Sequence, residues 1–150
     1  MEVKYDAMGN LTCVLDMDGY EYALTVRSHA IRRVVERWAY KNLMTSAETG
    51  KLFADMMLCK SMADFILWEI PLDGKSHSFC VWDKQQNVAY TMSVVGQHII
   101  IHTALFAPKT PIWHDSGDRL LIVEMDGTVR ETADAETSDF ATKNKRKLQV

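Results

Sequence analysis

The alternation of hydrophobic and polar positions near the start of the chain predicts a β-hairpin. The stretch "LTCVLDMDGYEYALTV" at 11–26 contains two runs rich in β-forming residues. Between them lies Asp18-Gly19, a pair that favours the tight turns of short hairpin loops. We therefore expect two antiparallel strands before the first helix.

A helical period follows the hairpin. Ser28 occupies the position of an N-cap, and the apolar positions after it recur at helical spacing. These positions are Ile31, Val34, Val35 and Trp38. The spacing predicts a helix from Ser28 to about Asn42, with these side chains buried.

A second helical region carries more of the apolar residues. Thr45, with Glu48 three positions later, forms a capping box, and "GKLFADMMLCKSMADFILWEI" at 50–70 supplies the hydrophobic surface. The part "ADFILWEI" also fits a short buried strand, because periodicity does not separate the two. Two or three helices are therefore expected before Pro71.

Strand signals dominate the second half of the chain. The runs "SHSFCVWD", "NVAYTMSVV" and "HIIIHTALF" are separated by short turn sequences, which predicts an antiparallel meander. A loop at 107–118 contains two prolines and a glycine, and 119–132 is typical of another hairpin. Helices and strands that are segregated in this way predict an α+β fold, with the helices packed on one face of an antiparallel sheet.

The apolar content falls after residue 132. Residues 133–150 are polar and end in "TKNKRKLQV", with too few apolar side chains to form a core. A chain of 150 residues is about the size of one domain. We therefore expect a single α+β domain over residues 1–132 and a disordered polar tail over 133–150.

Composition changes this picture in three respects. No apolar run approaches the roughly 20 residues that cross a bilayer, and "MEVKYDAMGN" lacks the apolar segment of a secretory signal, so we expect no membrane association. The three cysteines form no CxxC pair, which favours reduced thiols in a cytoplasmic protein. The net charge of −3 argues against a protein that coats nucleic acid over its whole surface, although it is compatible with a local basic face.

The first predicted helix concentrates positive charge. Residues 27–41 include five basic side chains and a single acidic one. Arg32, Arg33 and Arg37 lie on or beside the side opposite the apolar positions. Arginine binds phosphate oxygens through paired hydrogen bonds, so these three are candidate phosphate ligands. The same residues also fit an ordinary solvated helix face, on which Arg32 pairs with Glu36.

Two histidines are candidate catalytic groups. His29 lies in the first turn of the helix, where the helix dipole favours the neutral base. His102 lies in the middle of "HIIIHTALF", a strand that is apolar on both faces, where a polar side chain needs a partner or a pocket. By alternation, Thr103 is expected on the face opposite His102. A core histidine with satisfied hydrogen bonds is the other interpretation of His102.

RNA cleavage without a metal requires a base, an acid and cations for the charge that develops on phosphorus. His29, His102 and the helix arginines would supply all three if the helix and the strand bring them together. "WHDSGD" at 113–118 lacks standard metal-ligand spacing and is interpreted as a turn. No phosphate-binding glycine loop, GxSxG or HExxH sequence is present, so we expect neither a metal nor a cofactor.

The order of elements from Arg27 to Phe106 resembles that of a known family. "SHAIRRVVERW", followed by further helix and "FCVWDKQQNVAYTMSVVGQHIIIHTALF", is similar to the small RelE-like toxin and toxin-related domains of the barnase–EndoU–colicin–RelE superfamily of ribonucleases. In one branch of it, a helix opens with a histidine followed by spaced arginines, which implies that role for His29 and for Arg33 or Arg37. A late strand of the "x-V-T-V-L" kind is matched here by "IIIHTALF".

The resemblance implies a function and leaves an alternative. It implies a RelE-like, toxin-related protein that binds or cleaves RNA without a metal and has a cognate antitoxin as protein partner. The N-terminal hairpin, the loop at 108–118 and the long tail depart from the family pattern. The alternative is therefore a relative without catalysis, a protein-interaction module of phage or mobile-element origin on the same fold.

Overall fold

The computed structural model describes residues 2–38 and 45–143, without the side chains of residues 35–38. The elements in chain order are β1 (Lys4–Tyr5), β2 (Leu11–Met17), β3 (Tyr20–Val26), α1 (Ser28–Trp38), α2 (Ser46–Leu58), α3 (Lys60–Glu69), β4 (Ser76–Asp83), β5 (Val88–Val95), β6 (His98–Phe106), β7 (Ile112–His114), β8 (Arg119–Val123), β9 (Val129–Thr132) and β10 (Phe140–Thr142). The sequence pattern at 63–70 fits either a helix or a short buried strand. In the structure this segment is helical up to Glu69, as part of α3.

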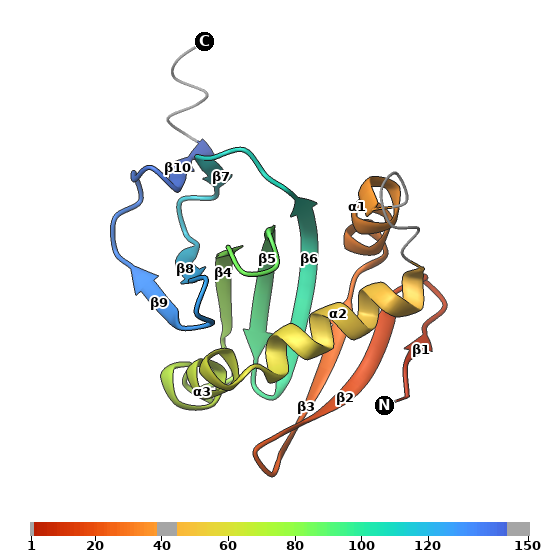
Figure 1. Cartoon of the computed structure of the whole chain (residues 1–150). Helices are drawn as coiled ribbons and strands as arrows, with labels where there is room; N and C mark the ends of the chain where they lie inside the picture. Colours follow the sequence, from red (N-terminus) through yellow and green to blue (C-terminus); the bar gives the residue numbers. More distant parts are fainter. Residues whose placement is uncertain (1, 39–44, 144–150) are drawn as a thin grey trace.

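Eight of the described strands form one sheet, in the order β1-β2-β3-β6-β5-β4-β8-β9. Most neighbours are antiparallel, including the predicted meander β4-β5-β6. The neighbours β3 and β6, and β4 and β8, run parallel. The three helices pack against the sheet, and Figure 1 shows α2 crossing one of its faces. The α+β fold class with helices on one face of a mostly antiparallel sheet is confirmed.

The helices bury their apolar stripes against this face. In α1, Ala30, Ile31 and Val34 are buried, as the spacing predicts for the last two. The predicted burial of Val35 and Trp38 concerns side chains outside the described residues. α2 approaches β2 closely, since a Cβ atom at Gly50 would lie 2.9 Å from the Leu11 methyl carbons. None of the described helices is both long enough and apolar enough to span a membrane.

A second, smaller core lies on the other face of the sheet. Its members are Cys80, Trp82, Ala89, Ile112, Leu120, Ile122 and Phe140. β10 pairs with β7 in parallel, and the Phe140 side chain is fully buried. Residues 133–143 thus differ from the disordered tail expected from 133 onward, because one large aromatic side chain anchors an otherwise polar segment. Residues 144–150 lie outside the described part of the chain.

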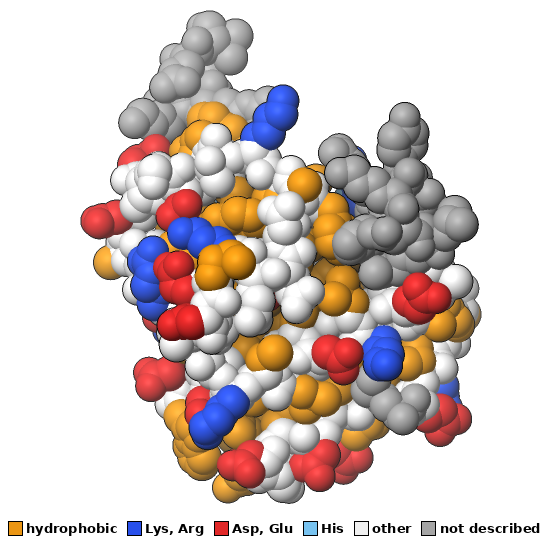
Figure 2. Space-filling view, in the orientation of Figure 1, with side chains coloured by type: hydrophobic (Ala, Val, Ile, Leu, Met, Phe, Trp, Pro, Cys, Tyr) orange, Lys and Arg blue, Asp and Glu red, His pale blue; other side chains and the backbone are white. Residues whose placement is uncertain are grey.

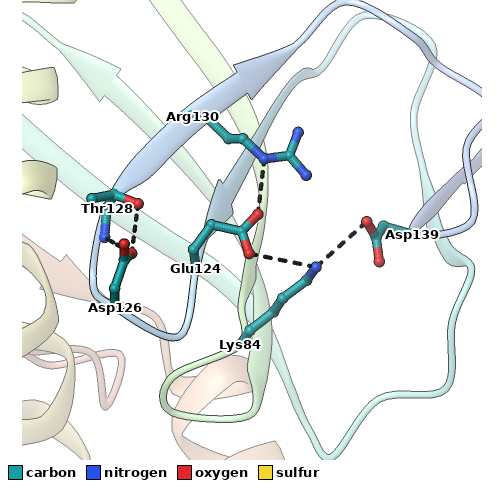
Figure 3. A network of polar contacts seen from close by, with 6 residues as sticks. All are labelled: Lys84, Glu124, Asp126, Thr128, Arg130 and Asp139. Atoms are coloured by element: carbon teal, nitrogen blue, oxygen red, sulfur yellow. Dashed lines mark hydrogen bonds and ion pairs between the residues drawn. The ribbon is translucent and has the colours of Figure 1, made fainter.

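A network of ion pairs joins this segment to the sheet (Figure 3). The Lys84 ammonium lies 3.8 Å from a Glu124 carboxylate oxygen and 3.7 Å from one of Asp139. Glu124 also accepts a 2.8 Å hydrogen bond from Arg130 Nε. Partly exposed ion pairs contribute at most about 1 kcal/mol each. The network therefore orients residues 133–143, and burial of Phe140 supplies most of their stabilisation.

Among the described side chains, the main core contains one buried polar atom without a hydrogen-bond partner. The Tyr90 side chain is buried against Phe53, with ring centroids 5.6 Å apart, and its hydroxyl has no hydrogen-bond partner among the described residues. An unsatisfied buried hydroxyl costs about 1–3 kcal/mol.

Substitution of Tyr90 by phenylalanine tests this cost. Because Tyr90→Phe removes the hydroxyl and keeps the ring contact, we expect the free energy of unfolding to stay equal or to rise by about 1 kcal/mol or more. Urea denaturation of both proteins measures the change. A loss of more than about 1 kcal/mol would show instead that the hydroxyl has a partner in solution.

Candidate functional site

An irregularity in the sheet gathers polar side chains on the face opposite the helices, which we call the open face. Thr91 pairs with Thr103 and Met92 with Ile101, so that His102 is the extra residue of a bulge. The Thr91 and Thr103 hydroxyl oxygens lie 2.8 Å apart, and His102 contacts Ser93 on the same face. The bulge therefore places Thr103 beside His102, and the expectation from strict alternation is wrong.

A short chain of hydrogen bonds fixes His102. Its Nε2 atom lies 2.8 Å from the Ser93 hydroxyl oxygen, which lies 3.4 Å from that of Ser78. With Nε2 deprotonated, the Ser93 hydroxyl donates to the ring; with Nε2 protonated, the ring donates to Ser93. Nδ1 has no hydrogen-bond partner among the described residues, and this nitrogen is available to exchange a proton with a ligand.

His102 lies in an open hollow of about 320 Å³, which we call the His102 hollow. Its polar lining consists of Ser78, Thr91, Ser93, His102, Thr103, Asp115, Asp118 and Lys143. The Lys143 ammonium lies 3.5 Å from an Asp115 carboxylate oxygen. The hollow thus combines an imidazole, hydroxyl groups, two carboxyl groups and an ammonium group.

The electrostatics of the hollow shift the pKa values of His102 and Asp118 in opposite directions. Burial lowers the pKa of His102, the positive charge of Arg27 lowers it further, and Asp118 opposes both effects. Burial raises the pKa of Asp118, an effect to which the charge of Asp115 adds. A hydrogen bond with Asp115 and the charges of His114 and Lys143 act in the opposite direction. These shifts bring the two pKa values closer together than those of a free aspartate and a free histidine.

The thiol beside the hollow is unreactive. Burial, with a contribution from Asp118, raises the pKa of Cys80 to about 12. Thiolate is the nucleophilic form of cysteine, so Cys80 supplies no nucleophile at neutral pH.

The structure separates His29 from His102. His29, Arg32 and Arg33 are exposed on α1, whose buried side packs on the helix face of the sheet, and none of the three lines the His102 hollow. Among the described residues, no hydrogen bond joins His29 to His102. The side chains of Arg37 and Glu36 lie outside the described residues. The expected pairing of Arg32 with Glu36 therefore stays a prediction.

Arg27 is the basic residue of this region whose charge reaches His102. It follows β3 directly, and its backbone N–H donates to the carbonyl of Ile101 at 3.0 Å. α1 begins at the next residue, so Arg27 joins β3 to the helix that carries the exposed arginines.

Sequence reasoning missed Ser78, Ser93 and Lys143 as members of the site and interpreted Asp118 as a turn residue. One signal was present, since Ser76 and Ser78 alternate along β4, and Thr91 and Ser93 along β5. The strand register that brings Ser78 beside Ser93 does not follow from alternation. Lys143 was assigned to the tail.

A second histidine on β6 has a similar partner outside the hollow. His98 Nε2 lies 2.8 Å from the Thr25 hydroxyl oxygen, across the parallel junction of β6 with β3. His98 does not line the His102 hollow. The two histidines therefore share a strand and a face, and each contacts a hydroxyl group, but their surroundings differ.

Comparison of the chain with protein-family models, with curated proteins and with solved structures gave no match. The RelE-like resemblance is therefore supported only by the order of elements and the residues that match it. Within the described part of the chain, no group of three or more His, Cys, Asp or Glu side chains is arranged to hold a metal ion. The groups of the His102 hollow are those of acid–base chemistry.

Proposed function

We propose that this chain is a RelE-like, toxin-related protein that binds RNA on the open face of its sheet and cleaves it at the His102 hollow without a metal. The observation that carries the proposal is the hydrogen-bonded His102 in an open hollow that it shares with Asp118 and Lys143. A cognate antitoxin is the protein partner that the resemblance implies.

The chemistry assigned to the hollow is attack of the RNA 2′-hydroxyl on the adjacent phosphorus. One group removes the 2′-hydroxyl proton and another protonates the departing 5′-oxygen. His102 and Asp118 fill these two roles, and Arg27 and Lys143 stabilise the charge that develops on the phosphate oxygens. Ser93 positions the imidazole through its hydrogen bond to Nε2.

The cations of the proposed path lie on two neighbouring surfaces. Lys143 lines the hollow, Arg27 acts on His102 through its charge, and Arg32, Arg33 and Arg37 follow on α1. Figure 2 shows the helix-bearing face, where the Lys and Arg side chains in view are interspersed with acidic and hydrophobic ones. RNA is therefore assigned to the open face, on a path that continues past Arg27 to the arginines of α1.

The salt dependence of RNA binding tests this assignment. Each phosphate contact to a single strand contributes a slope of about 0.7 in a plot of log affinity against log salt concentration. Arg27→Ala with Lys143→Ala removes two proposed contacts, so we expect the slope to fall by about 1.4. Fluorescence anisotropy with a labelled RNA oligonucleotide in a chelating buffer measures it.

Two further variants complete this experiment. Lys51→Ala with Lys60→Ala removes the same charge from the helices, and we expect no change in slope. Joint replacement of Arg32, Arg33 and Arg37 by alanine is expected to lower the slope by about two. If Arg27→Ala with Lys143→Ala changed the slope no more than Lys51→Ala with Lys60→Ala, this result would contradict a specific site. It would favour the non-catalytic interaction module.

A further inference from the structure

One edge of the sheet is left open. β2 has seven residues, but β1 pairs only with Leu11 and Thr12. Among the described residues, Cys13–Met17 therefore have a strand neighbour on one side only, which is β3. Figure 1 shows this part of β2 extending past β1 without a further strand beside it. The free backbone N–H and C=O groups of such an edge are able to pair with another chain.

The opposite edge is built differently. β9 has four residues and presents the charged side chains of Arg130 and Glu131. Short edge strands with exposed charges prevent pairing with other chains. The free part of β2 instead exposes Val14, whose side chain is 56% accessible, and carries one charged residue, Asp16. The β9 edge therefore carries more of the features that prevent association than the free part of β2 does.

A hollow of about 480 Å³ runs along the free edge. Its apolar lining includes Cys13, Val14 and Leu15 of β2 together with Leu58 at the end of α2. Leu58 is itself 39% exposed. Glu2, Lys4, Thr12, Asp16 and Ala23 complete the lining, so the hollow borders both sides of β2, and a strand added to this edge would place side chains in it.

Exposed apolar side chains gather around the same edge. Of the nine large hydrophobic side chains that are exposed in the described part of the chain, six lie in the segment from β1 to β3 or against it. These six are Tyr5, Met8, Val14, Tyr20, Leu58 and Trp68, the last of which contacts Tyr20 edge to face. Clustered exposed apolar surface of this kind marks interaction sites.

We propose that the free edge of β2 pairs with the β2 edge of a second copy of this chain, antiparallel and centred on Leu15. The free residues Cys13–Met17 are symmetric about Leu15, as a two-fold interface requires. In this register Val14 lies opposite Asp16 of the second copy, and Cys13 opposite its Met17. No two carboxylates face each other, and the apolar positions of the two strands meet on the helix side.

The symmetry also determines what the pair would look like. A two-fold axis perpendicular to the sheet keeps the helices of both copies on one side, where the two Leu58 side chains approach the junction. The open faces of the two copies then form one continuous surface. This pairing is independent of the proposed RNA chemistry.

A charge-swap series tests the pairing and its register by light scattering during size-exclusion chromatography. We expect the wild-type protein to be a dimer. Val14→Asp places two pairs of carboxylates opposite each other, so the dimer dissociation constant should rise by about tenfold or more. Adding Asp16→Lys to this variant turns both pairs into opposite charges and should restore the dimer. Leu105→Asp, an exposed position outside the edge, should leave the dimer unchanged.

Cysteine cross-linking tests the register separately. Residues directly opposite in an antiparallel pair have Cα atoms about 4.5–5.5 Å apart, which permits a disulfide. An equal mixture of Val14→Cys and Asp16→Cys proteins should form a cross-linked dimer on oxidation, whereas neither variant alone should do so. A monomeric wild-type protein would overturn the proposal, as would a dimer that Val14→Asp leaves intact or a cross-link formed by Val14→Cys alone.

Discussion

Replacement of Phe140 by alanine is expected to lower the free energy of unfolding by about 3–5 kcal/mol. The Phe140 ring is fully buried between β7, β8 and the central strands, and it contacts the His114 ring edge to face at 6.0 Å. Removing it takes away the largest side chain with which residues 133–143 contact the core, and it leaves a cavity. Urea denaturation, with the slope of the transition checked for a change, measures the loss.

The matched control for this prediction is Leu72→Ala. Leu72 is 66% exposed, so its truncation should change the free energy of unfolding by no more than about 0.5 kcal/mol. If Phe140→Ala had an equally small effect, residues 133–143 would not pack on the sheet in solution. Such a result would show that the folded domain ends at about residue 132, as the sequence predicts.

Replacement of His102 by alanine is expected to reduce RNA cleavage by about 10²- to 10⁴-fold, the usual contribution of a positioned acid or base. The fold should be retained, because His102 is only partly buried and its hydrogen bond to Ser93 joins neighbouring strands that are paired on both sides of the bulge. Cleavage of a labelled RNA in a chelating buffer, followed over a range of pH values, measures both the rate and its titration.

The pH profile distinguishes an acid–base role from a purely structural one. One group must be protonated and the other deprotonated, so the rate should be highest between the raised pKa of Asp118 and the lowered pKa of His102. This range is mildly acidic, above about 4 and below about 6.5, whichever group is the base. The rate should rise as Asp118 loses its proton and fall as His102 loses its proton. His102→Ala should remove the alkaline limb and Asp118→Asn the acidic limb.

His98→Ala is the matched control for the catalytic prediction. His98 shares the strand and the face with His102 and also contacts a hydroxyl group, that of Thr25, but it does not line the hollow. We expect its replacement to leave the rate within about threefold of the wild type, on the scale of small barrier changes. Equal losses for His98→Ala and His102→Ala, or cleavage that survives His102→Ala, would remove the hollow as the site.

The candidate site was predictable only in its central residue. A histidine in the middle of an apolar strand had to find a partner or a pocket, and this physical requirement pointed to His102. The sequence did not predict the hydrogen-bond partners of His102, because Ser78 and Ser93 meet through the register of β4 and β5. Lys143 enters the hollow only because Phe140 anchors the segment before it. The expected meeting of His29 with His102 failed because α1 packs on the face of the sheet opposite the hollow.

The sequence by itself determined the strand hairpin at the start, the helices in the middle, the meander and the α+β class. These features depend on local periodicity, turn residues and capping residues, which act over a few positions of the chain. Only the tertiary structure decided that β3 and β6 are parallel neighbours, that a bulge turns Thr103 to the side of His102, and that β2 keeps a free edge. Neighbours and registers depend on contacts between distant segments, whose free energies no local pattern contains.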